Sequence, residues 1–336
     1  MTVGDLDRAR GMGLSAIHSR LAQLLGEVDV RLARVWQGQD EFIGHAAERA
    51  LLGPGKRLRP TILLLAAECS GRATEHALSL ASVVEVVHAA SLIHDDVLDS
   101  APSRRGRRSP NALWDNKISV LLGDYLIARA LDLLPAGHRE RWVPELAELA
   151  RRMCEGQIRE LRAAGRALSE GQYLDIARAK TGSIFAFCGS AGAEMSGGPP
   201  GLAAPLRRFG ESFGIAFQVA DDILDLVGTD GQSGKPEGRD AAERKFTLPL
   251  ILAAESSSEA RAELGRIFAK AELSQEDVQA VRALARSAGA VDAAWQRVAQ
   301  WLQSACEQLG AVPESDAKQA LIALCGDRFP MPVMAD

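Results

Sequence analysis

Apolar residues near the start of the chain recur at intervals of three and four. They stand at positions 14, 17, 21, 24, 28, 32 and 35. This spacing places them on one face of a helix with about 3.6 residues per turn. The same pattern returns near the other end, at Trp295, Val298, Leu302, Ala305 and Leu309. Helices are therefore predicted at both ends of the chain.

The segments between these ends are rich in Ala and Leu, with Glu and Arg interspersed. These residues favour helices, whereas the alternating β-branched runs that favour strands are lacking. The sequence therefore predicts an all-α fold. Gly and Pro clusters interrupt the pattern at 53–55, 100–110, 135–137, 197–201 and 228–240. None is long enough to link autonomous domains, so we expect one helical domain over residues 1–336.

Two acidic motifs of identical spacing each follow an apolar segment. They are Asp-Asp-Val-Leu-Asp at 95–99 and Asp-Asp-Ile-Leu-Asp at 221–225. Residues four apart share a helix face, so the first and last aspartates of each motif project together and repel. Ligand sets made only of carboxylates favour hard cations such as Mg²⁺ over zinc. Solvated acidic faces are the alternative, which the apolar flanks disfavour.

Composition narrows the class of function. A net charge of −5 argues against a general nucleic-acid binder. The five cysteines are odd in number and form no Cys-x-x-Cys pair, which favours reduced thiols over disulfides or a zinc site. The acidic start of the chain and the lack of a long apolar run predict no secretory signal and no membrane span. We therefore expect a cytoplasmic protein.

Basic residues follow both acidic motifs. They are Arg104, Arg105, Arg107 and Arg108 after the first, and Lys235, Arg239, Arg244 and Lys245 after the second. A third basic group occupies 56–59. Acids that hold a metal beside cations that hold phosphate oxygens suit a Mg²⁺-diphosphate. Because there are more cations than one diphosphate requires, the sequence predicts two diphosphates with apolar remainders.

A series of short motifs occurs in a characteristic order. They are Gly55-Lys56-Arg57-Leu58-Arg59-Pro60, His88 to Asp96, Arg104-Arg105-Gly106, Gly123-Asp124-Tyr125-Leu126, Lys180-Thr181, Phe217-Gln218, the second acidic motif, Gly234-Lys235, and Lys245 with Thr247-Leu248-Pro249. In this order they resemble the trans-isoprenyl diphosphate synthases, or polyprenyl synthetases, from about position 50 to 253. The resemblance implies antiparallel helices around a deep central cavity, a homodimer, and Mg²⁺-dependent condensation of isopentenyl diphosphate with an allylic diphosphate.

The resemblance also implies a role for each matching residue. The metal ligands would be Asp95, Asp96, Asp99, Asp221, Asp222 and Asp225. The allylic diphosphate would be held by Arg104, Lys180 and Lys235. Isopentenyl diphosphate would be held by Lys56, Arg59, His88 and Arg105. The groups that face the allylic cation would be Lys180, Thr181 and Gln218, and Lys245 would complete the substrate-binding set.

The chemistry of this reaction accounts for these residue types. Breaking the allylic C–O bond leaves a negative diphosphate and a positive carbon, so metals and cations must neutralise the leaving group. The oxygen dipoles of Thr181 and Gln218 can face the carbocation without trapping it as a strong nucleophile would. The departed diphosphate can take the proton, so no dedicated protein base is required.

Small side chains precede the first acidic motif. In the family, an aromatic residue five positions before the first aspartate limits chain growth, whereas here that residue is Ala90, with Ser91 and Val87 nearby. We therefore expect a product of about C30 or more. A geranylgeranyl or farnesyl diphosphate synthase is the alternative, because Leu131 and its neighbours on the next helix could close the tunnel.

Two further classes of function are disfavoured. A terpene cyclase needs no site for isopentenyl diphosphate, and Lys56, Arg59 and His88 weigh against it. A non-catalytic partner subunit would be expected to lose acidic residues, but both motifs are complete. His94 does not share the face of Asp95 and is expected to be structural.

Overall fold

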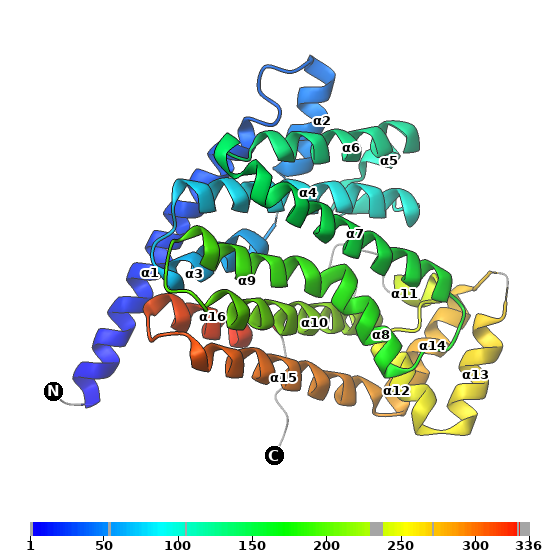
Figure 1. The fold of residues 1–336 in the computed structure, drawn as a ribbon. Coiled ribbons are helices and arrows are strands. Elements are labelled where there is room, and N and C mark those ends of the chain that lie inside the picture. Colours follow the sequence, from blue (N-terminus) through cyan, green and yellow to red (C-terminus); the bar gives the residue numbers. More distant parts are fainter. Residues whose placement is uncertain are drawn as a thin grey trace. The chain divides into compact units, whose positions relative to one another are not determined.

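The computed structural model describes residues 3–52, 55–104, 106–228, 238–270, 272–327 and 329, with side chains from residue 16 to 326 and at 329. The α-helices are α1 (Val3–Ala33), α2 (Glu41–Leu51), α3 (Leu58–Ser70), α4 (Glu75–Leu98), α5 (Pro110–Leu113), α6 (Asn116–Asp132), α7 (Arg139–Ala163), α8 (Glu170–Ala177), α9 (Ser183–Met195), α10 (Ala203–Val227), α11 (Arg239–Ala242), α12 (Leu248–Ser256), α13 (Ser258–Phe268), α14 (Gln275–Ser287), α15 (Ala290–Gln308) and α16 (Asp316–Asp327). The all-α prediction is confirmed (Figure 1).

Three short turns and one small hairpin complete the described elements. The turns are η1 (Ala136–His138) and η3 (Leu309–Ala311), which are 3₁₀, and η2 (Arg178–Gly182), which is a π turn. The hairpin pairs β1 (Ser103–Arg104) with β2 (Arg107–Arg108) in antiparallel register. These strands fall in the Gly/Pro-rich segment that the sequence marks as a break in the helical pattern.

The chain divides into two compact units. Unit 1 contains Met1–Glu148, Phe185–Gly210 and Gln308–Gly326, and unit 2 contains Leu149–Ile184, Glu211–Glu307 and Asp327–Asp336. The first acidic motif lies in unit 1 and the second lies in unit 2. The expected single domain with a central cavity stays a prediction.

Unit 1 is built around α4, which packs against α1, α3 and α6. The helix is long and apolar enough to cross a membrane, but 61% of its apolar 18-residue segment is buried inside the protein. It is therefore the core helix of this unit. Its start is fixed by the Thr74 side chain, which accepts a hydrogen bond from the Ala77 N–H.

The close contact between α4 and α6 depends on Gly123. A Cβ at this position would lie only 2.1 Å from Nε2 of His94, so the glycine leaves room for the imidazole. His94 Nε2 in turn lies 3.2 Å from the Val120 carbonyl oxygen on α6. His94 therefore joins the two helices, as expected for a structural residue.

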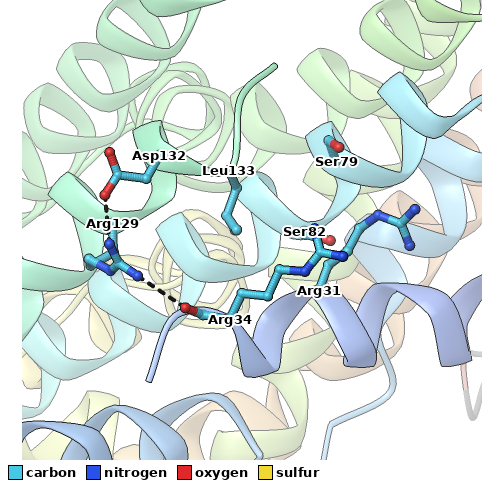
Figure 2. Close-up of a pocket in the computed structure, with 7 residues that line it drawn as sticks. All are labelled: Arg31, Arg34, Ser79, Ser82, Arg129, Asp132 and Leu133. Atoms are coloured by element: carbon cyan, nitrogen blue, oxygen red, sulfur yellow. Dashed lines mark hydrogen bonds and ion pairs between the residues drawn. The ribbon is translucent and has the colours of Figure 1, made fainter. Parts of the chain in front are cut away.

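A pocket of about 170 Å³ lies at the other end of α4 in unit 1 (Figure 2). Arg129 of α6 lines it, pairs with Asp132 at 2.8 Å and donates to the Arg34 carbonyl oxygen at 3.0 Å. These contacts fasten the end of α6 to the end of α1. None of the predicted site residues lines this pocket.

Unit 2 places α12, α13 and α14 in mutual contact and sets α11 against α14. Arg282 of α14 is buried, and its guanidinium donates to the carbonyl oxygens of Leu226 at 2.7 Å and Gly228 at 2.9 Å. These carbonyls belong to the end of α10, where helix carbonyls lack partners within the helix. The cation thus fixes the helix end that carries the second acidic motif.

Candidate active site

The first acidic motif lies at the C-terminal end of α4, with Asp99 as the residue that caps the helix. Asp95 and Asp99 are half-buried, whereas Asp96 is buried. The Arg104 guanidinium pairs with Asp96 at 2.7 Å, and Asn111 donates its amide N–H to the Asp96 carbonyl oxygen at 3.2 Å. The hairpin is therefore fastened to the middle aspartate of the motif.

The second acidic motif lies on the last turns of α10. Asp221 is exposed, Asp222 is buried and Asp225 is half-buried. The Tyr173 hydroxyl donates to Asp222 at 2.6 Å, and the Gln218 amide donates to it at 2.7 Å. Burial, followed by the charge of Asp240, raises the pKa of Asp222 well above its ordinary value. The middle aspartate is again held by protein groups.

The two motifs thus share one arrangement. In each, the middle aspartate turns into the protein, while the first and last lie four residues apart and share the other face of the helix. The identical spacing predicts that the first and last aspartates project together. The spacing does not predict that the middle aspartate is buried, because periodicity alone does not show which face of an apolar helix points into the protein.

Lys180 and Thr181 lie in the π turn η2, a conformation that is rare and often occurs at functional sites. Arg178, at the start of the turn, pairs with Glu211 of α10 at 3.0 Å. Gly182 packs on the same helix, where a Cβ would lie 3.5 Å from the Glu211 carbonyl oxygen. The turn is therefore fixed on α10 at Glu211, nearly three helical turns before the acidic motif.

A directed chain of hydrogen bonds joins the π turn to the second motif. The Thr181 hydroxyl donates to the Gln218 amide oxygen at 2.6 Å, and the amide nitrogen of Gln218 donates to Asp222. The hydroxyl proton of Thr181 is used in this bond, so its remaining lone pairs are the feature that it can present to a ligand. The structure brings Thr181 and Gln218 together, as the predicted roles require.

Two of the lysines predicted as ligands in unit 2, Lys180 and Lys245, meet at one acidic residue. Nζ of Lys180 lies 2.7 Å from Oε2 of Glu160, and Nζ of Lys245 lies 3.9 Å from the same oxygen. Lys245 also contacts Glu243 at 2.6 Å and Asp240 at 3.5 Å. Lys245 therefore lies among three acidic side chains, and its role as a substrate ligand stays a prediction.

The acids of this cluster have shifted pKa values. Burial opposes the ionisation of Glu160, but Lys180 and Lys245 together outweigh it, so the pKa of Glu160 lies below its ordinary value. Burial, followed by the charge of Asp225, raises the pKa of Asp240 to about 7. Asp225 also accepts a hydrogen bond from the Asp240 N–H at 3.0 Å.

Sequence reasoning missed Glu160, Tyr173 and Asp240. Glu160 lies in a helix with many Glu and Arg residues, and a single sequence contains no signal that separates it from solvated neighbours. Tyr173 and Asp240 reach the second motif only through the tertiary fold. Their involvement could not be found from local spacing.

The basic group of unit 1 lies at the start of α3. Arg57 has a left-handed backbone (φ 47°) and pairs with Glu85 of α4 at 2.6 Å and Asp29 of α1 at 3.1 Å. Its neighbour Lys56 is exposed, whereas the Arg59 guanidinium lies 4.7 Å from the ring centroid of Phe185. Arg57 therefore fixes the turn from which Lys56 and Arg59 extend.

The remaining predicted residues differ in how deeply they are buried. His88 is half-buried on α4, two turns before Asp95. Arg105 and Lys235 lie outside the described residues. Ala90 is fully buried, and Val87 and Ser91 are half-buried on the same helix. Leu131, named for the alternative tunnel floor on α6, is 36% exposed, and that alternative stays a prediction.

Within the described ranges, no group of three or more His, Cys, Asp or Glu side chains is placed to hold a metal ion by itself. Mg²⁺ is commonly bound through one or two carboxylates together with substrate phosphates. The first and last aspartates of each motif offer such a donor pair, and oxygen-only ligands suit this ion. The assignment of all six aspartates as ligands stays a prediction.

Comparison with known proteins decides the family. A family model described as polyprenyl synthetase matches residues 40–285. The chain belongs to the polyprenyl synthetase family. This result confirms the resemblance read from the motifs, and with it the class of enzyme, a prenyltransferase.

Individual members of the family are similar over most of their length. An all-trans-nonaprenyl-diphosphate synthase (geranyl-diphosphate specific) of Rhodobacter capsulatus is 39% identical, over 80% of this chain and 83% of that protein. An octaprenyl diphosphate synthase of Haemophilus influenzae is 34% identical, over 84% and 86%. The crystal structure of a polyprenyl synthase from Caulobacter crescentus, complexed with calcium and isoprenyl diphosphate, superposes with a TM-score of 0.87 at 34% identity, covering 93% and 96%.

Proposed function

We propose that this polyprenyl synthetase catalyses Mg²⁺-dependent head-to-tail condensation of isopentenyl diphosphate with an allylic diphosphate. The observation that carries the proposal is the hydrogen-bonded chain from Thr181 through Gln218 to Asp222. It joins the group expected to face the carbocation to the motif expected to hold the metal. A surface acidic helix would have no reason to bury such a chain.

Each group in this chain of hydrogen bonds has a defined task. Asp222 accepts two hydrogen bonds and so fixes the Gln218 amide, whose oxygen then accepts from Thr181. The Thr181 oxygen is left with lone pairs but no free donor, which favours a cation beside it and disfavours an anion. The arrangement stabilises an allylic cation without offering a strong nucleophile.

The metal and the cations would act on the leaving group. The pairs Asp95 with Asp99 and Asp221 with Asp225 would hold Mg²⁺, which supplies charge neutralisation to the departing diphosphate. Lys180 and Arg104 would hold the same diphosphate, and Lys56, Arg59 and His88 would hold isopentenyl diphosphate. Because Lys245 lies among Glu160, Asp240 and Glu243, its contribution would be to neutralise these acids.

We also propose a product of about C30 or more. Ala90 leaves the α4 side of the growing prenyl chain without an aromatic barrier. The relatives named nonaprenyl and octaprenyl diphosphate synthase are 39% and 34% identical to this protein over the aligned residues. Geranylgeranyl or farnesyl diphosphate is the alternative product. It would require a barrier elsewhere than Ala90.

A homodimer in the cytoplasm completes the proposal. The apolar side chains of Val120, Leu121, Ile127 and Leu131 are 36–64% exposed on α6. Val120, Ile127 and Leu131 recur at intervals of seven and four and so form a stripe along the helix, and Leu121 lies beside this stripe. Exposed apolar stripes of this kind are typical of protein interfaces. The free cysteines agree with a reducing compartment.

Release of inorganic diphosphate tests the reaction itself. The purified protein should release it only when Mg²⁺, isopentenyl diphosphate and an allylic diphosphate are all present, and chelation by EDTA should abolish release. A terpene cyclase would release diphosphate from the allylic substrate alone. A non-catalytic subunit would release none under any combination, and either result would refute the proposal.

A further inference from the structure

Glu160 occupies a position that the predicted reaction does not explain. Its carboxylate lies near the end of α7, with 18% of the side chain exposed, and contacts the ammonium of Lys180 at 2.7 Å. The second lysine, Lys245, lies 3.9 Å from the same oxygen. One largely buried acid is therefore shared by two cations.

The two lysines depend on this acid to different degrees. Lys245 has closer or comparable acidic neighbours in Glu243 at 2.6 Å and Asp240 at 3.5 Å. For Lys180 the Glu160 carboxylate is an immediate neighbour that both pairs with it and accepts its hydrogen bond. Because the Glu160 oxygen lies 2.7 Å from the Lys180 ammonium and 3.9 Å from that of Lys245, loss of its charge should affect Lys180 more than Lys245.

The backbone also fixes Glu160 against Lys180. Gly156 lies one turn earlier on the same face of α7. A Cβ there would lie 2.7 Å from the Lys180 backbone nitrogen and 3.0 Å from its Cα. Helix α7 therefore approaches the π turn at a glycine, which sets the distance between the carboxylate and the ammonium.

We propose that Glu160 is a positioning residue, which holds the Lys180 ammonium ready to receive the allylic diphosphate. This inference rests on the proposed role of Lys180. A lysine side chain loses rotamer entropy when it is fixed. Because the ion pair fixes Lys180 before substrate arrives, binding of the diphosphate does not have to provide that ordering.

A positioning role differs from simple neutralisation of buried charge. If Glu160 only stabilised the fold, its loss would lower stability and impair both substrates alike. If it positions Lys180, its loss should weaken the allylic diphosphate selectively. The two Michaelis constants therefore separate the roles.

The test uses Glu160→Gln, which keeps the side-chain shape and removes the charge. Glu155→Gln is the matched control, since Glu155 is on the same helix and pairs with Arg151 and Arg159 on its surface. We expect Glu160→Gln to lower kcat/KM for the allylic diphosphate by about tenfold or more, the scale of a hydrogen bond between charged groups. The KM for isopentenyl diphosphate should stay within about twofold, and the control should match wild type.

Calorimetry supplies a readout independent of turnover. Affinity for an unreactive allylic thiodiphosphate, measured with Mg²⁺, should fall about tenfold in Glu160→Gln. Glu160→Asp, which restores the charge one methylene further away, should recover part of the loss. In a Lys180→Met background, Glu160→Gln should change this affinity by less than about twofold, because the group it positions is absent.

Unchanged allylic affinity in a folded Glu160→Gln protein, or equal losses for both substrates, would overturn the inference. If Glu160→Gln does not fold, Glu160→Asp must show a smaller loss that is still selective for the allylic diphosphate. Equal losses for both substrates in Glu160→Asp would also overturn the inference. Wild-type protein that is inactive with every primer would instead refute the proposed function.

Discussion

At the scale of single residues, the structure separates aspartates that look equivalent in the sequence. Asp96 and Asp222 are buried and held by Arg104 and by Tyr173 with Gln218, respectively. The outer aspartates lie on the other face of their helices. The i to i+4 spacing predicts that the outer pairs project together, but the burial of the middle residues depends on partners far away in the sequence.

The outer and middle aspartates should therefore respond differently to substitution. Asp221→Ala should lower kcat by about 10² or more, the scale of a lost electrostatic stabiliser, with little change in stability because Asp221 is exposed. Asp222→Ala should also destabilise the fold by about 1–3 kcal/mol, since the buried Tyr173 hydroxyl and the half-buried Gln218 amide lose their acceptor. Steady-state kinetics in saturating Mg²⁺ and urea unfolding measure the two effects. Near-normal turnover of Asp221→Ala would contradict the metal assignment.

Tyr173 allows a second test, because the chain has only two tyrosines. Tyr173→Phe removes a donor from buried Asp222 and should reduce the free energy of unfolding by about 1–3 kcal/mol. Tyr125→Phe is the matched control, since the Tyr125 hydroxyl lies 3.5 Å from the Val35 carbonyl oxygen and should contribute little. Urea unfolding of both variants compares them. Equal stability of the two variants would show that the Tyr173 bond is unimportant.

At the scale of elements, apolar periodicity predicts the long helices but not the short special ones. Helices α1 and α15 cover the stripes at 14–35 and 295–309, apart from the last position of each. The π turn spans only five residues, and one altered turn inside a helical pattern leaves no signature in a single sequence. The same holds for the hairpin, whose strands have two residues each. These two elements hold Lys180, Thr181 and Arg104, so the parts least visible in the sequence carry predicted ligands.

Helix α4 should set product length through Ala90. Ala90→Tyr adds a large ring at a fully buried position, and a packed interior cannot absorb this volume without strain or loss of open space. The main product should shift towards about C15–C20, while the first condensation persists because the acidic motif lies more than one helical turn away. Chromatography of dephosphorylated products measures the shift. An active variant with unchanged product lengths would show that the chain grows along another path.

At the scale of the whole molecule, the family and the all-α class could be predicted from the order of motifs and the helical pattern. The division into two compact units could not, because both units are assembled from segments far apart in the sequence. Self-association is likewise not encoded in any local motif. It depends on which apolar side chains the fold leaves exposed, such as those on α6.

The proposed dimer can be disrupted at Leu121, which is 64% exposed on α6. Leu121→Glu should convert the protein to a monomer, because a charge would be buried in an apolar interface without a partner. Val30→Glu is the matched control, since Val30 is 65% exposed on α1 and lies apart from the stripe. Size-exclusion chromatography with light scattering gives the mass of each. A monomeric wild type, or a dimeric Leu121→Glu, would refute this interface.

The proposed activity of this protein is the elongation of prenyl diphosphates to medium or long products. The most direct measurement incubates the wild-type protein with Mg²⁺, excess isopentenyl diphosphate and geranyl, farnesyl or geranylgeranyl diphosphate in turn, then sizes the dephosphorylated products by chromatography. We expect all-trans products of about C30 or more from at least one primer. Products that end at C15 or C20 with every primer, or an absence of condensation, would contradict it.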